Sequence, residues 1–472
     1  MTTMFASAPT RAPFTPLSAR DLARAARFDE TVRIGAGALL WGSLIWVGYL
    51  WSHGSGIQDL GSWTNGLMST GRLTGLLASV LLLAQVVLIA RVPILERAFG
   101  QDRLLQHHRI VGFTSFNMMV AHIVLITWGY AGGELSRTPS TLWDLTVNYP
   151  GMLLAVAGTL CLILTVATSI KAARRKLRYE SWHLLHLYAY LGVGLALPHQ
   201  LWTGQDFLSS PAATVFWWGA WATAAAAILI WRVGLPIWRN LRHQLVVTGV
   251  EHEADGTYSV HITGRALHRF PVHAGQFLNW RFLGRPGWTR GNPYSLSAAP
   301  SRHGLRITVK ELGDNSSRIA SLRPGSRVVV EGPYGRLTQR PRTRERLLFI
   351  GAGVGITPLR ALVEGMSYRP GEATLLHRWT EQPLFGDEFE TLAEQRGLEV
   401  VDLVGRRRAA DSWLGSNTPE GSDLATLRAL VPDVAERDLY ICGPEQWTAA
   451  VRATALAAGT PATSIHIENF NW

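Results

Sequence analysis

The first half of the chain consists of long apolar runs, whereas the second half alternates short apolar runs with turn residues. Few charged residues lie between Ile34 and Trp231. Six of the apolar runs are long enough, at about 20 residues each, to cross a hydrocarbon core of about 30 Å as α-helices. They cover residues 34–52, 71–91, 110–131, 150–170, 184–203 and 213–232. The pattern therefore predicts a six-helix membrane part followed by a part outside the membrane.

Basic residues gather in the connections between alternate apolar runs. They are Arg91, Arg97, Arg103 and Arg109, the segment 171–178, and Arg232, Arg239 and Arg242. Because cytoplasmic loops carry an excess of Lys and Arg, these loops and both chain ends are predicted to be cytoplasmic. We expect a multi-pass protein of the cell membrane that contacts the lipid bilayer, and the basic runs also suit lipid headgroups.

The second half predicts two different kinds of sheet. From Leu245 onward, short β-rich runs broken by Gly and Pro indicate a small antiparallel barrel. After Arg346, strand, Gly-rich turn and helix alternate, which favours a parallel α/β sheet. The predicted domains are a cytoplasmic N-terminal segment (1–30), a six-helix all-α transmembrane domain (31–235), a β-barrel domain (240–340) and an α/β domain (345–472).

Charge and cysteine content exclude several classes of protein. The formal net charge is +11, but the basic residues lie beside apolar runs instead of forming one stripe with aromatic side chains, so no nucleic-acid partner is expected. Cys161 and Cys442 are the only cysteines, too few for a four-cysteine iron–sulfur cluster or a disulfide framework. The first thirty residues contain arginines but no short apolar stretch with a cleavage site, so no signal peptide is predicted.

Four histidines lie at paired depths in two of the apolar runs. His108 and His122 bracket the third run, fourteen residues apart, and His186 and His199 bracket the fifth, thirteen residues apart. At a rise of 1.5 Å per residue each pair spans about 20 Å, which is room for two stacked haems. We predict that His108 and His186 are the iron ligands of a cytoplasmic-side haem, and His122 and His199 those of an outer haem.

The helical phase favours one pair over the other. Fourteen steps return to within about 40° of the same helix face, whereas thirteen steps land about 140° away. Pro198 directly precedes His199 and is predicted to kink the helix and re-aim the next turn. His107 and His183 are competing ligands, and otherwise are expected to contact the haems or their propionates.

With these histidine spacings, the chain resembles the NADPH oxidase and ferric reductase superfamily. Its six-helix domain carries two haems on two histidine pairs in its third and fifth helices, and the resemblance extends over nearly the whole chain after about residue 30. It implies two b-type haems. Arg72 then matches an arginine near the outer haem and the acceptor site, although a snorkelling arginine at the interface is the alternative. Animal oxidases have a histidine where this chain has Ile126, a departure that bears on superoxide formation.

The segment GNPYSLSAAP at 291–300 resembles the flavin-binding motif of the ferredoxin reductase family. The resemblance implies that the ring of Tyr294 packs on the isoalloxazine, and that Ser295 and Ser297 contact its polar edge. A barrel strand that exposes Tyr and Ser alternately is the other interpretation of these residues.

A second flavin element is VKELGDNSSRI at 309–319. It resembles the family's Gly turn that leads into a helix start, which implies that Ser316 and Ser317 face a pyrophosphate and that the flavin is FAD. An ordinary helix cap is the alternative. Asn292 stands where the family usually has Arg or His, and Arg290 is predicted to supply the missing charge.

Two segments resemble the nicotinamide-binding elements of ferredoxin reductases. GAGVGITP follows an apolar strand and opens a helix, so its glycines let a dinucleotide approach the helix N-terminus. The second element is CGP, in which Cys442 is predicted to position groups at the hydride-transfer site and not to act as a nucleophile. The other predicted cofactor-binding residues here are Gly351, Gly353, Gly355, Thr357, Pro358, Gly443 and Pro444.

Arginines after successive strands indicate NADPH in preference to NADH. Arg378, Arg406 and Arg407 are predicted to bind the ribose 2′-phosphate, although the arginine run also suits a solvated surface. The chain end IHIENFNW resembles the terminal segment in which an aromatic ring covers the flavin. That implies a gating role for Phe470, with Trp472 as a substitute, and Phe470→Ser is expected to tighten nicotinamide binding.

The resemblance implies an oxidoreductase that passes electrons from cytoplasmic NADPH through FAD and two haems to an acceptor outside. Two histidines per iron leave no open position, so the acceptor is expected to react at the haem edge. O₂, giving superoxide, is the expected acceptor, with chelated Fe(III) or Cu(II) as alternatives. A periplasmic partner enzyme is a further alternative, and segment 132–149 with Trp143 permits its docking. A transporter with a histidine proton relay would leave the flavin and nucleotide motifs unexplained.

Overall fold

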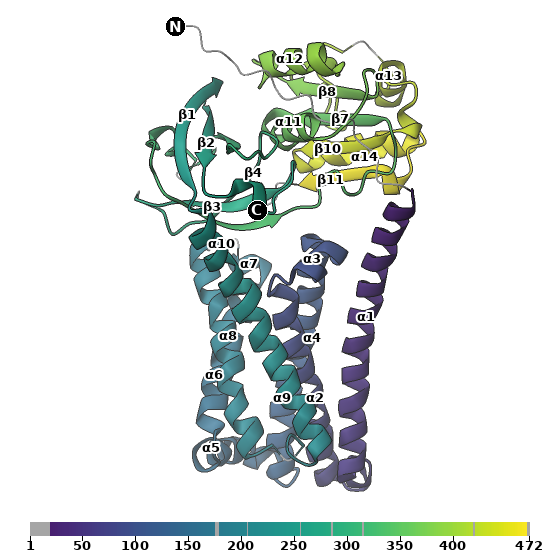
Figure 1. The fold of residues 1–472 in the computed structure, drawn as a ribbon. Coiled ribbons are helices and arrows are strands. Elements are labelled where there is room, and N and C mark those ends of the chain that lie inside the picture. The colour runs from purple at the N-terminus through teal and green to yellow at the C-terminus, as the bar shows by residue number, and fades with distance from the viewer. Residues whose placement is uncertain are drawn as a thin grey trace. The chain divides into compact units, whose positions relative to one another are not determined.

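The chain divides into two compact units, which we call the helical unit and the sheet unit (Figure 1). The computed structural model describes residues 19–174, 179–204, 206–254, 256–284, 287–313, 316–418 and 421–469. The helical unit is Phe28–Leu235, and the sheet unit contains Pro236–Trp472. The predicted order of a helical part followed by a sheet-containing part is confirmed.

Long helices dominate the helical unit. Its main helices are α1 (Ala19–Trp51), α2 (Trp63–Ile89), α3 (Pro93–Phe99), α4 (Gln101–Tyr130), α5 (Thr138–Asn148), α6 (Met152–Ser169), α7 (Lys171–Arg174), α8 (Tyr179–Trp202) and α9 (Pro211–Ala227). Local sequence sets several starts: Ser62 caps α2 by accepting a hydrogen bond from Asn65 N, and Ser210 caps α9 just before Pro211. A π-helical turn at Ile228–Gly234 leads from α9 into α10 (Leu235–His243).

Five helical segments within the described residues are long and apolar enough to cross a membrane. They are Arg27–Gly56, Trp63–Ile89, Arg103–Tyr130, Met152–Ser169 and Pro211–His243. The remaining predicted span, 184–203, falls in α8, which is 24 residues long and is not among the five. Several apolar helices are therefore established, whereas the count of six spans stays a prediction.

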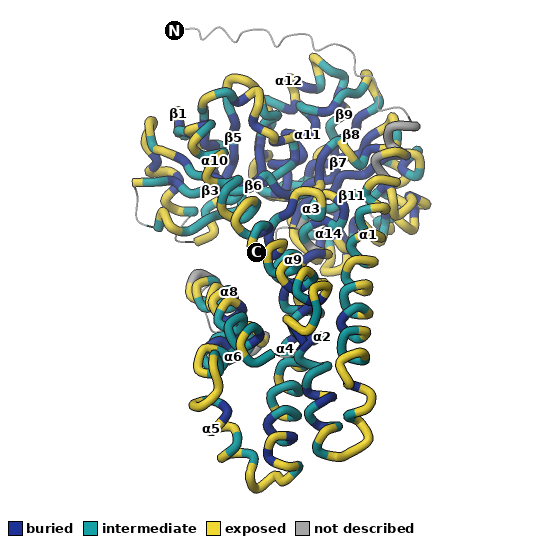
Figure 2. The backbone as a smooth tube through the Cα atoms, turned by 60° about the horizontal axis from the view of Figure 1, so that its bottom comes forward, coloured by how far each residue is buried: buried dark blue, intermediate teal, exposed yellow. Residues whose placement is uncertain are grey.

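Two helix pairs make the most extensive contacts in the helical unit: α2 with α4, and α6 with α8. Small residues allow them, since a β-carbon at Gly158 of α6 would lie 2.7 Å from the carbonyl oxygen of Gly192 of α8. Large apolar side chains point outward instead, with Leu39 75% exposed and Phe113 71% exposed. Figure 2 shows this pattern of intermediate and exposed residues along the helices. Lipid tails are the surroundings that such a surface suits.

The first part of the sheet unit contains two three-stranded antiparallel sheets. One has the order β1 (Val246–Ala254), β2 (Thr257–Thr263), β5 (Leu305–Lys310), and the other β4 (Asn292–Ser295), β3 (Phe277–Phe282), β6 (Val328–Tyr334). Isolated bridges join Val246 of β1 to Arg327 and Leu296 to Ile307 of β5. The two sheets share one core, whose largest side chains include Trp280 and Phe282. The predicted antiparallel strands are present, and closure into a barrel stays a prediction.

The second part is a five-stranded parallel sheet. Its order is β11 (Ile465–Asn469), β10 (Asp438–Gly443), β7 (Leu347–Ala352), β8 (Ala373–Trp379), β9 (Glu399–Val404). The helices between strands are α11 (Ile356–Gly365), α12 (Gly386–Arg396), α13 (Asp423–Leu430) and α14 (Glu445–Ala457). Separate apolar clusters cover the two faces of the sheet, which explains why β7 and β10 are buried along their whole length.

Candidate functional site

Two predicted metal ligands on α4 are anchored by backbone carbonyl groups of α2. The Nδ1 atom of His108 lies 3.2 Å from the carbonyl oxygen of Gln85, and that of His122 lies 2.7 Å from the carbonyl oxygen of Gly71. A carbonyl oxygen only accepts hydrogen bonds, so each Nδ1 must carry the proton. Each Nε2 then keeps its lone pair, which is the state of a histidine that binds a metal.

His186 of α8 reaches the same state through a serine. Its Nδ1 lies 3.2 Å from Oγ of Ser169, and that hydroxyl donates its one proton to the carbonyl oxygen of Thr165 at 2.7 Å. Ser169 therefore accepts from His186, and it also accepts from the indole N–H of Trp182 at 3.3 Å. The ring of Trp182 lies beside the imidazole, with centroids 5.0 Å apart. The tautomer and the orientation of His186 are thus both constrained.

The structure brings the predicted inner pair together across two helices. The ring centroids of His108 and His186 are 6.2 Å apart and the ring planes cross at 65°. The rings do not hydrogen-bond to each other, and their anchored Nδ1 atoms leave both Nε2 atoms available. This arrangement could hold one iron between two helices.

The predicted outer pair consists of His122 on α4 and His199 on α8. His122 and His199 are near enough for a charge on one ring to act on the other. The Nδ1 of His199 is buried and has no hydrogen-bond partner. In this respect His199 differs from the other three predicted ligands, whose Nδ1 atoms are each held by an acceptor. The backbone of His199 packs tightly on Gly151, where a β-carbon would lie 2.8 Å from its N atom.

Two glycines make room for these contacts. A β-carbon at Gly75 would lie 2.5 Å from Nδ1 of His122, and one at Gly112 would lie 2.5 Å from Oε1 of Gln85. Sequence analysis missed both glycines and the residues that anchor the histidines. The sequence feature that could have indicated these contacts is the presence of several glycines in the second and third apolar runs, because glycine permits close contact between helices.

The competing ligand His107 has a different environment. It is exposed, and its Nδ1 bonds to the carbonyl oxygen of Arg103 in its own helix at 2.6 Å. His183 lies one turn before His186 on α8.

Arg72 of α2 forms ion pairs with two aspartates, Asp206 and Asp59. Its Nε and Nη2 donate to the two carboxylate oxygens of Asp206 at 3.0 and 2.8 Å. Nη2 also donates to the carbonyl oxygen of Gly54 at 3.0 Å, and Nη1 lies 3.5 Å from Asp59. Two carboxylates therefore balance its charge. Arg72 directly follows Gly71, the partner of His122, so it lies at the level of the predicted outer pair.

In the flavin motif, Ser295 carries an unused polar group. It is buried at the end of β4, and its Oγ has no hydrogen-bond partner. Tyr294 is half-buried and packs against the core of the antiparallel sheets, while its carbonyl oxygen accepts from the indole of Trp280 at 2.9 Å. A ligand that offers a polar edge beside Ser295 would satisfy this hydroxyl. The residues therefore fit a flavin.

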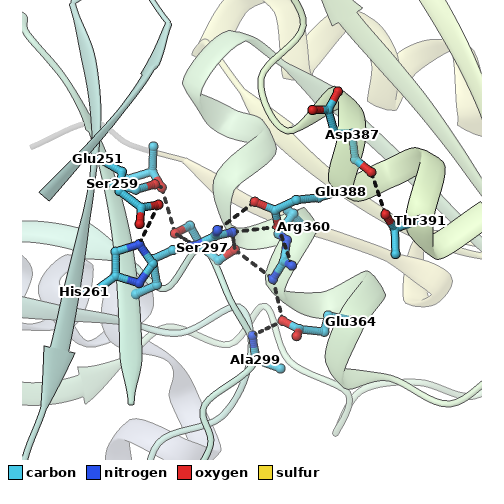
Figure 3. A network of polar contacts seen from close by, with 12 residues as sticks. Glu251, Ser259, His261, Ser297, Ala299, Arg360, Glu364, Asp387, Glu388 and Thr391 are labelled. Atoms are coloured by element: carbon cyan, nitrogen blue, oxygen red, sulfur yellow. Dashed lines mark hydrogen bonds and ion pairs between the residues drawn. The ribbon is translucent and has the colours of Figure 1, made fainter. Parts of the chain in front are cut away.

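The hydroxyl of Ser297, the second serine of the flavin motif, has hydrogen-bond partners within the protein. Ser297 is fully buried, and its Oγ accepts from Thr308 at 2.7 Å and from Nε of Arg306 at 3.2 Å. Arg360 of α11 also donates to its carbonyl oxygen at 3.3 Å. Figure 3 shows Ser297 inside this polar network. The hydroxyl group of Ser297 therefore links β5 to the segment that follows β4 by hydrogen bonds.

The second flavin element forms a local turn. The hydroxyl of Ser316 accepts from the backbone N–H groups of Leu312 and Gly313 at 2.8 and 3.0 Å, and donates to the carbonyl oxygen of Gly313. The backbone N–H of Ser317 also bonds to Gly313. Arg290 is half-buried next to β4, with its backbone N–H bonded to Gly287.

The two predicted nicotinamide elements lie side by side. Cys442 of β10 is paired in register with Gly351 of β7, and a β-carbon at Gly355 would lie 2.5 Å from the carbonyl oxygen of Cys442. Gly353 has a φ of +55° with open space around it, so the turn needs glycine and leaves its backbone accessible. Thr357 donates its hydroxyl proton to Val354 at 2.9 Å and so fixes the start of α11.

Cys442 is buried, and its environment keeps the thiol neutral. Burial, followed by the negative charge of Glu468, raises the pKa of Cys442 well above its ordinary value. A thiol in this state is a poor nucleophile. Gly443 lies against Trp447, where a β-carbon would be 2.6 Å from the indole, and Pro444 precedes the first turn of α14. The segment 442–444 is therefore tightly packed against the start of α14.

Two of the predicted phosphate-binding arginines are close neighbours. Arg378 lies at the end of β8, beside Ala352 in the register, and its Nε is buried with no partner. Burial, and then the positive charge of Arg407, lowers the pKa of Arg378. Arg407 donates to the carbonyl oxygens of Ser412 and Ala410, and Arg406 is exposed. Two adjacent guanidinium groups, one with a free buried donor, suit a phosphate.

The predicted gating residues Phe470 and Trp472 lie outside the described residues. The described strand β11 ends at Asn469, beside Gly443 of β10.

Comparisons with known proteins identify both halves of the chain. Residues 74–197 match the family described as ferric reductase like transmembrane component, a range that includes His108, His122 and His186. Ferredoxin–NADP reductase B of Sorangium cellulosum is 30% identical over 222 residues, which cover 43% of this chain and 86% of that protein. The chain belongs to the NADPH oxidase and ferric reductase superfamily. As a superfamily member it is an oxidoreductase with a membrane part and a ferredoxin reductase-like part that binds FAD and NAD(P)H.

Other proteins are similar to a little under half of this chain. The reductase subunit of stachydrine N-demethylase from Rhizobium meliloti is 30% identical, and the chain spans 62% of its length. Among solved structures, a ferredoxin NADP⁺ reductase from Neisseria gonorrhoeae with bound FAD and NADP is 19% identical, with a TM-score of 0.39. That match covers 48% of this chain and 98% of the solved chain.

Proposed function

We propose that this protein carries electrons across the cell membrane, from cytoplasmic NADPH through FAD and two bis-histidine b-type haems to an acceptor on the other side. The observation that carries the proposal is the common protonation state of three histidines. His108, His122 and His186 each have an acceptor at Nδ1, which leaves Nε2 for a metal. A histidine that only donates a hydrogen bond inside the core does not need a free Nε2 atom opposite a second such histidine on a facing helix.

In this proposal each haem is held by one histidine from α4 and one from α8. His108 and His186 hold the inner haem, and the 6.2 Å between their ring centroids supports the pair. His122 and His199 hold the outer haem, and the bond from Nδ1 of His122 to the carbonyl oxygen of Gly71 supports the role of His122. Such haems carry single electrons and keep no open iron position, so the acceptor reacts at the haem edge.

In the sheet unit, Ser295 and Tyr294 hold the flavin, and the segments around Gly353 and Cys442 hold the nicotinamide nucleotide. When bound, FAD accepts a hydride and releases electrons one at a time. The free Nε of Arg378 favours NADPH over NADH because it can donate to a 2′-phosphate. Arg407 adds a second positive charge there. The neutral Cys442 thiol acts as a positioning group beside Gly351.

The proposal places six spans in the membrane, with α8 as the fifth and both chain ends in the cytoplasm. The basic residues between alternate apolar runs support this orientation. The sheet unit then lies where NADPH is made and used.

O₂, giving superoxide, is the first acceptor that we propose. A chelate of Fe(III) or Cu(II) is the second, and the pairing of Arg72 favours it. Because Asp206 and Asp59 already balance the Arg72 charge, this guanidinium has little capacity to stabilise an anionic oxygen product. A chelate does not need that charge.

The experiment is an anaerobic reduction of the purified protein loaded with haem and FAD. NADPH is added, and reduction of the haem is followed by its absorption spectrum. O₂ or an Fe(III) chelate is then admitted while reoxidation and superoxide are recorded. Fast reoxidation by O₂ with trapped superoxide supports an oxidase, and fast reaction with the chelate alone supports a metalloreductase. A preparation without a haem spectrum contradicts the proposal.

A further inference from the structure

A network of four charged side chains links the nucleotide-binding part of the sheet unit to the strand that carries the flavin motif (Figure 3). Arg306 of β5 donates through both Nη atoms to the carboxylate of Glu388 of α12, at 2.7 and 3.0 Å. Arg360 of α11 also pairs with Glu388, and it pairs with Glu364 of its own helix. Two arginines and two glutamates thus balance each other within one cluster.

This cluster is attached to the backbone that follows Ser295. Nε and Nη2 of Arg306 donate to the hydroxyl and the carbonyl oxygen of Ser297 at 3.2 and 3.0 Å. The backbone N–H of Ala299 donates to Glu364 at 2.6 Å. Segment 297–299 is therefore held from both helices, and it begins two residues after the hydroxyl that the flavin would use.

The two helices in the network follow the two strands that end at the nucleotide site. Helix α11 begins directly after the glycine turn at 353–355, and α12 begins seven residues after Trp379, the end of β8, where Arg378 lies. A nucleotide that binds at these strand ends contacts the segments leading into α11 and α12. A displacement of α11 can reach segment 297–299 directly through Arg360 and Glu364. A displacement of α12 can reach it through the bond from Glu388 to Arg306.

The geometry of Arg306 is unusually well defined. Its side chain is 11% exposed, and all three nitrogen atoms donate hydrogen bonds. Nη1 and Nη2 donate to Glu388, and Nε and Nη2 donate to Ser297. Burial disfavours the charged form of Glu388, but the hydrogen bond from Arg306 and the charges of both arginines outweigh burial, so the pKa of Glu388 lies below its ordinary value. The carboxylate is therefore ionised at neutral pH. A planar guanidinium is needed to reach both partners at once.

We propose that Arg306 and Glu388 are positioning residues for hydride transfer, which couple nucleotide binding to the placement of Ser295 beside the flavin. The inference rests on the proposed role of Ser295. Neither residue touches the reacting atoms. Each acts through Ser297 and the strand β4.

The first test uses hydrogen exchange on the full-length protein in detergent or nanodiscs, without FAD. NADP⁺ is the probe. In the wild type, NADP⁺ is expected to slow amide exchange in residues 292–299, and in Arg306→Met this slowing is expected to disappear while exchange near Gly353 still responds. The matched control is Arg346→Met, which removes an exposed ion pair with Asp433 elsewhere in the same unit. Equal slowing in all three proteins overturns the inference.

The second test separates positioning from binding in the FAD-loaded protein. Because small misplacement of reacting groups costs rate, Arg306→Met is expected to lower the maximal rate of flavin reduction about tenfold, with KM for NADPH changed by less than about twofold. Arg306→Lys should recover part of the rate, since an ammonium can still pair with Glu388 but cannot also reach Ser297. Flavin circular dichroism and FAD content check that each variant is folded, and Arg306→Lys keeps the test informative where Arg306→Met is unstable.

The outcomes distinguish this inference from the proposed function. A wild type that reduces FAD normally, together with an Arg306→Met variant of unchanged rate, overturns the coupling and leaves the function intact. A wild type whose bound FAD is not reduced by NADPH overturns the function, and the coupling with it.

Discussion

Gly75 of α2 lies so close to His122 of α4 that a β-carbon at Gly75 would be 2.5 Å from the Nδ1 atom of the imidazole. Even one methyl group there must displace the ring or separate the two helices. The bond from His122 to Gly71 depends on the same close approach, because Gly71 is one turn earlier on α2.

We therefore expect Gly75→Ala to lose the outer haem selectively. Haem content, measured as the pyridine haemochrome, should fall from about two to about one per chain. The control is Gly42→Ala on α1, where a β-carbon meets nothing within 4 Å. Gly42→Ala should keep both haems and gain helix stability of about 0.5–1 kcal/mol. Full haem content in Gly75→Ala would argue against His122 as a ligand.

Removing His186 should affect the inner haem. His186→Ala is expected to bind about one haem per chain and to abolish electron transfer from FAD, while NADPH still reduces the flavin. His107→Ala is the control, since His107 is exposed and bonds to its own helix. If His107→Ala lost a haem and His186→Ala did not, the assignment of ligands would be wrong.

Arg378 should determine the choice of nucleotide. Because its buried Nε has no partner, Arg378→Ala is expected to raise KM for NADPH about 10- to 100-fold and to leave KM for NADH nearly unchanged. Steady-state kinetics with an artificial acceptor measure both constants. Arg408→Ala is the comparison, because Arg408 pairs with Asp423 at 3.0 Å and should change neither constant. Equal losses with both nucleotides would mean that Arg378 does not contact the 2′-phosphate.

His377 should make the stability of the sheet unit depend on pH. It is buried beside Phe389, its Nε2 has no partner, and burial lowers its pKa to about 4 despite the nearby charge of Asp402. In the unfolded chain the ordinary value is 6.5. Between these values the unfolded chain binds more protons, so the free energy of unfolding falls as the pH falls from 6.5 to about 4, by about 3 kcal/mol in total.

The release of FAD on heating, followed by its fluorescence, measures this effect. His377→Phe keeps the contact with Phe389 and should unfold with a weaker dependence on pH between 4 and 6.5. His268→Phe, at an exposed position, should behave like the wild type. Identical pH profiles for the wild type and His377→Phe would show that the pKa of this histidine does not change on folding.

Local patterns in the sequence were sufficient to predict the long helices, the change to sheets, and the positions of the nucleotide motifs. Each depends on residues that are neighbours along the chain, such as the glycines before α11 or the apolar run of β7. The two nicotinamide motifs were found separately in the sequence, and the pairing of Cys442 with Gly351 in the register of β7 and β10 brings them together.

The contacts that orient the site residues could not be predicted in the same way. Gln85 and Ser169 fix histidines from helices that are distant in the sequence, and Glu388 meets Arg306 across 82 residues. Ser297 appeared equivalent to Ser295 because both follow Tyr294 in one motif. Alternation along the chain cannot show that one hydroxyl is bonded within the protein while the other is unpaired.

The two bonds from α2 to α4 also determine how this protein can adapt to different membranes. Gln85 and Gly71 are fourteen residues apart, as are their partners His108 and His122. One inserted residue between either pair would rotate the following turns by about 100° and break a bond. The separation of the two histidine levels is therefore counted in residues and is independent of bilayer thickness. A thicker or thinner membrane must be accommodated by the helix segments beyond these levels, and the length of the electron path stays the same.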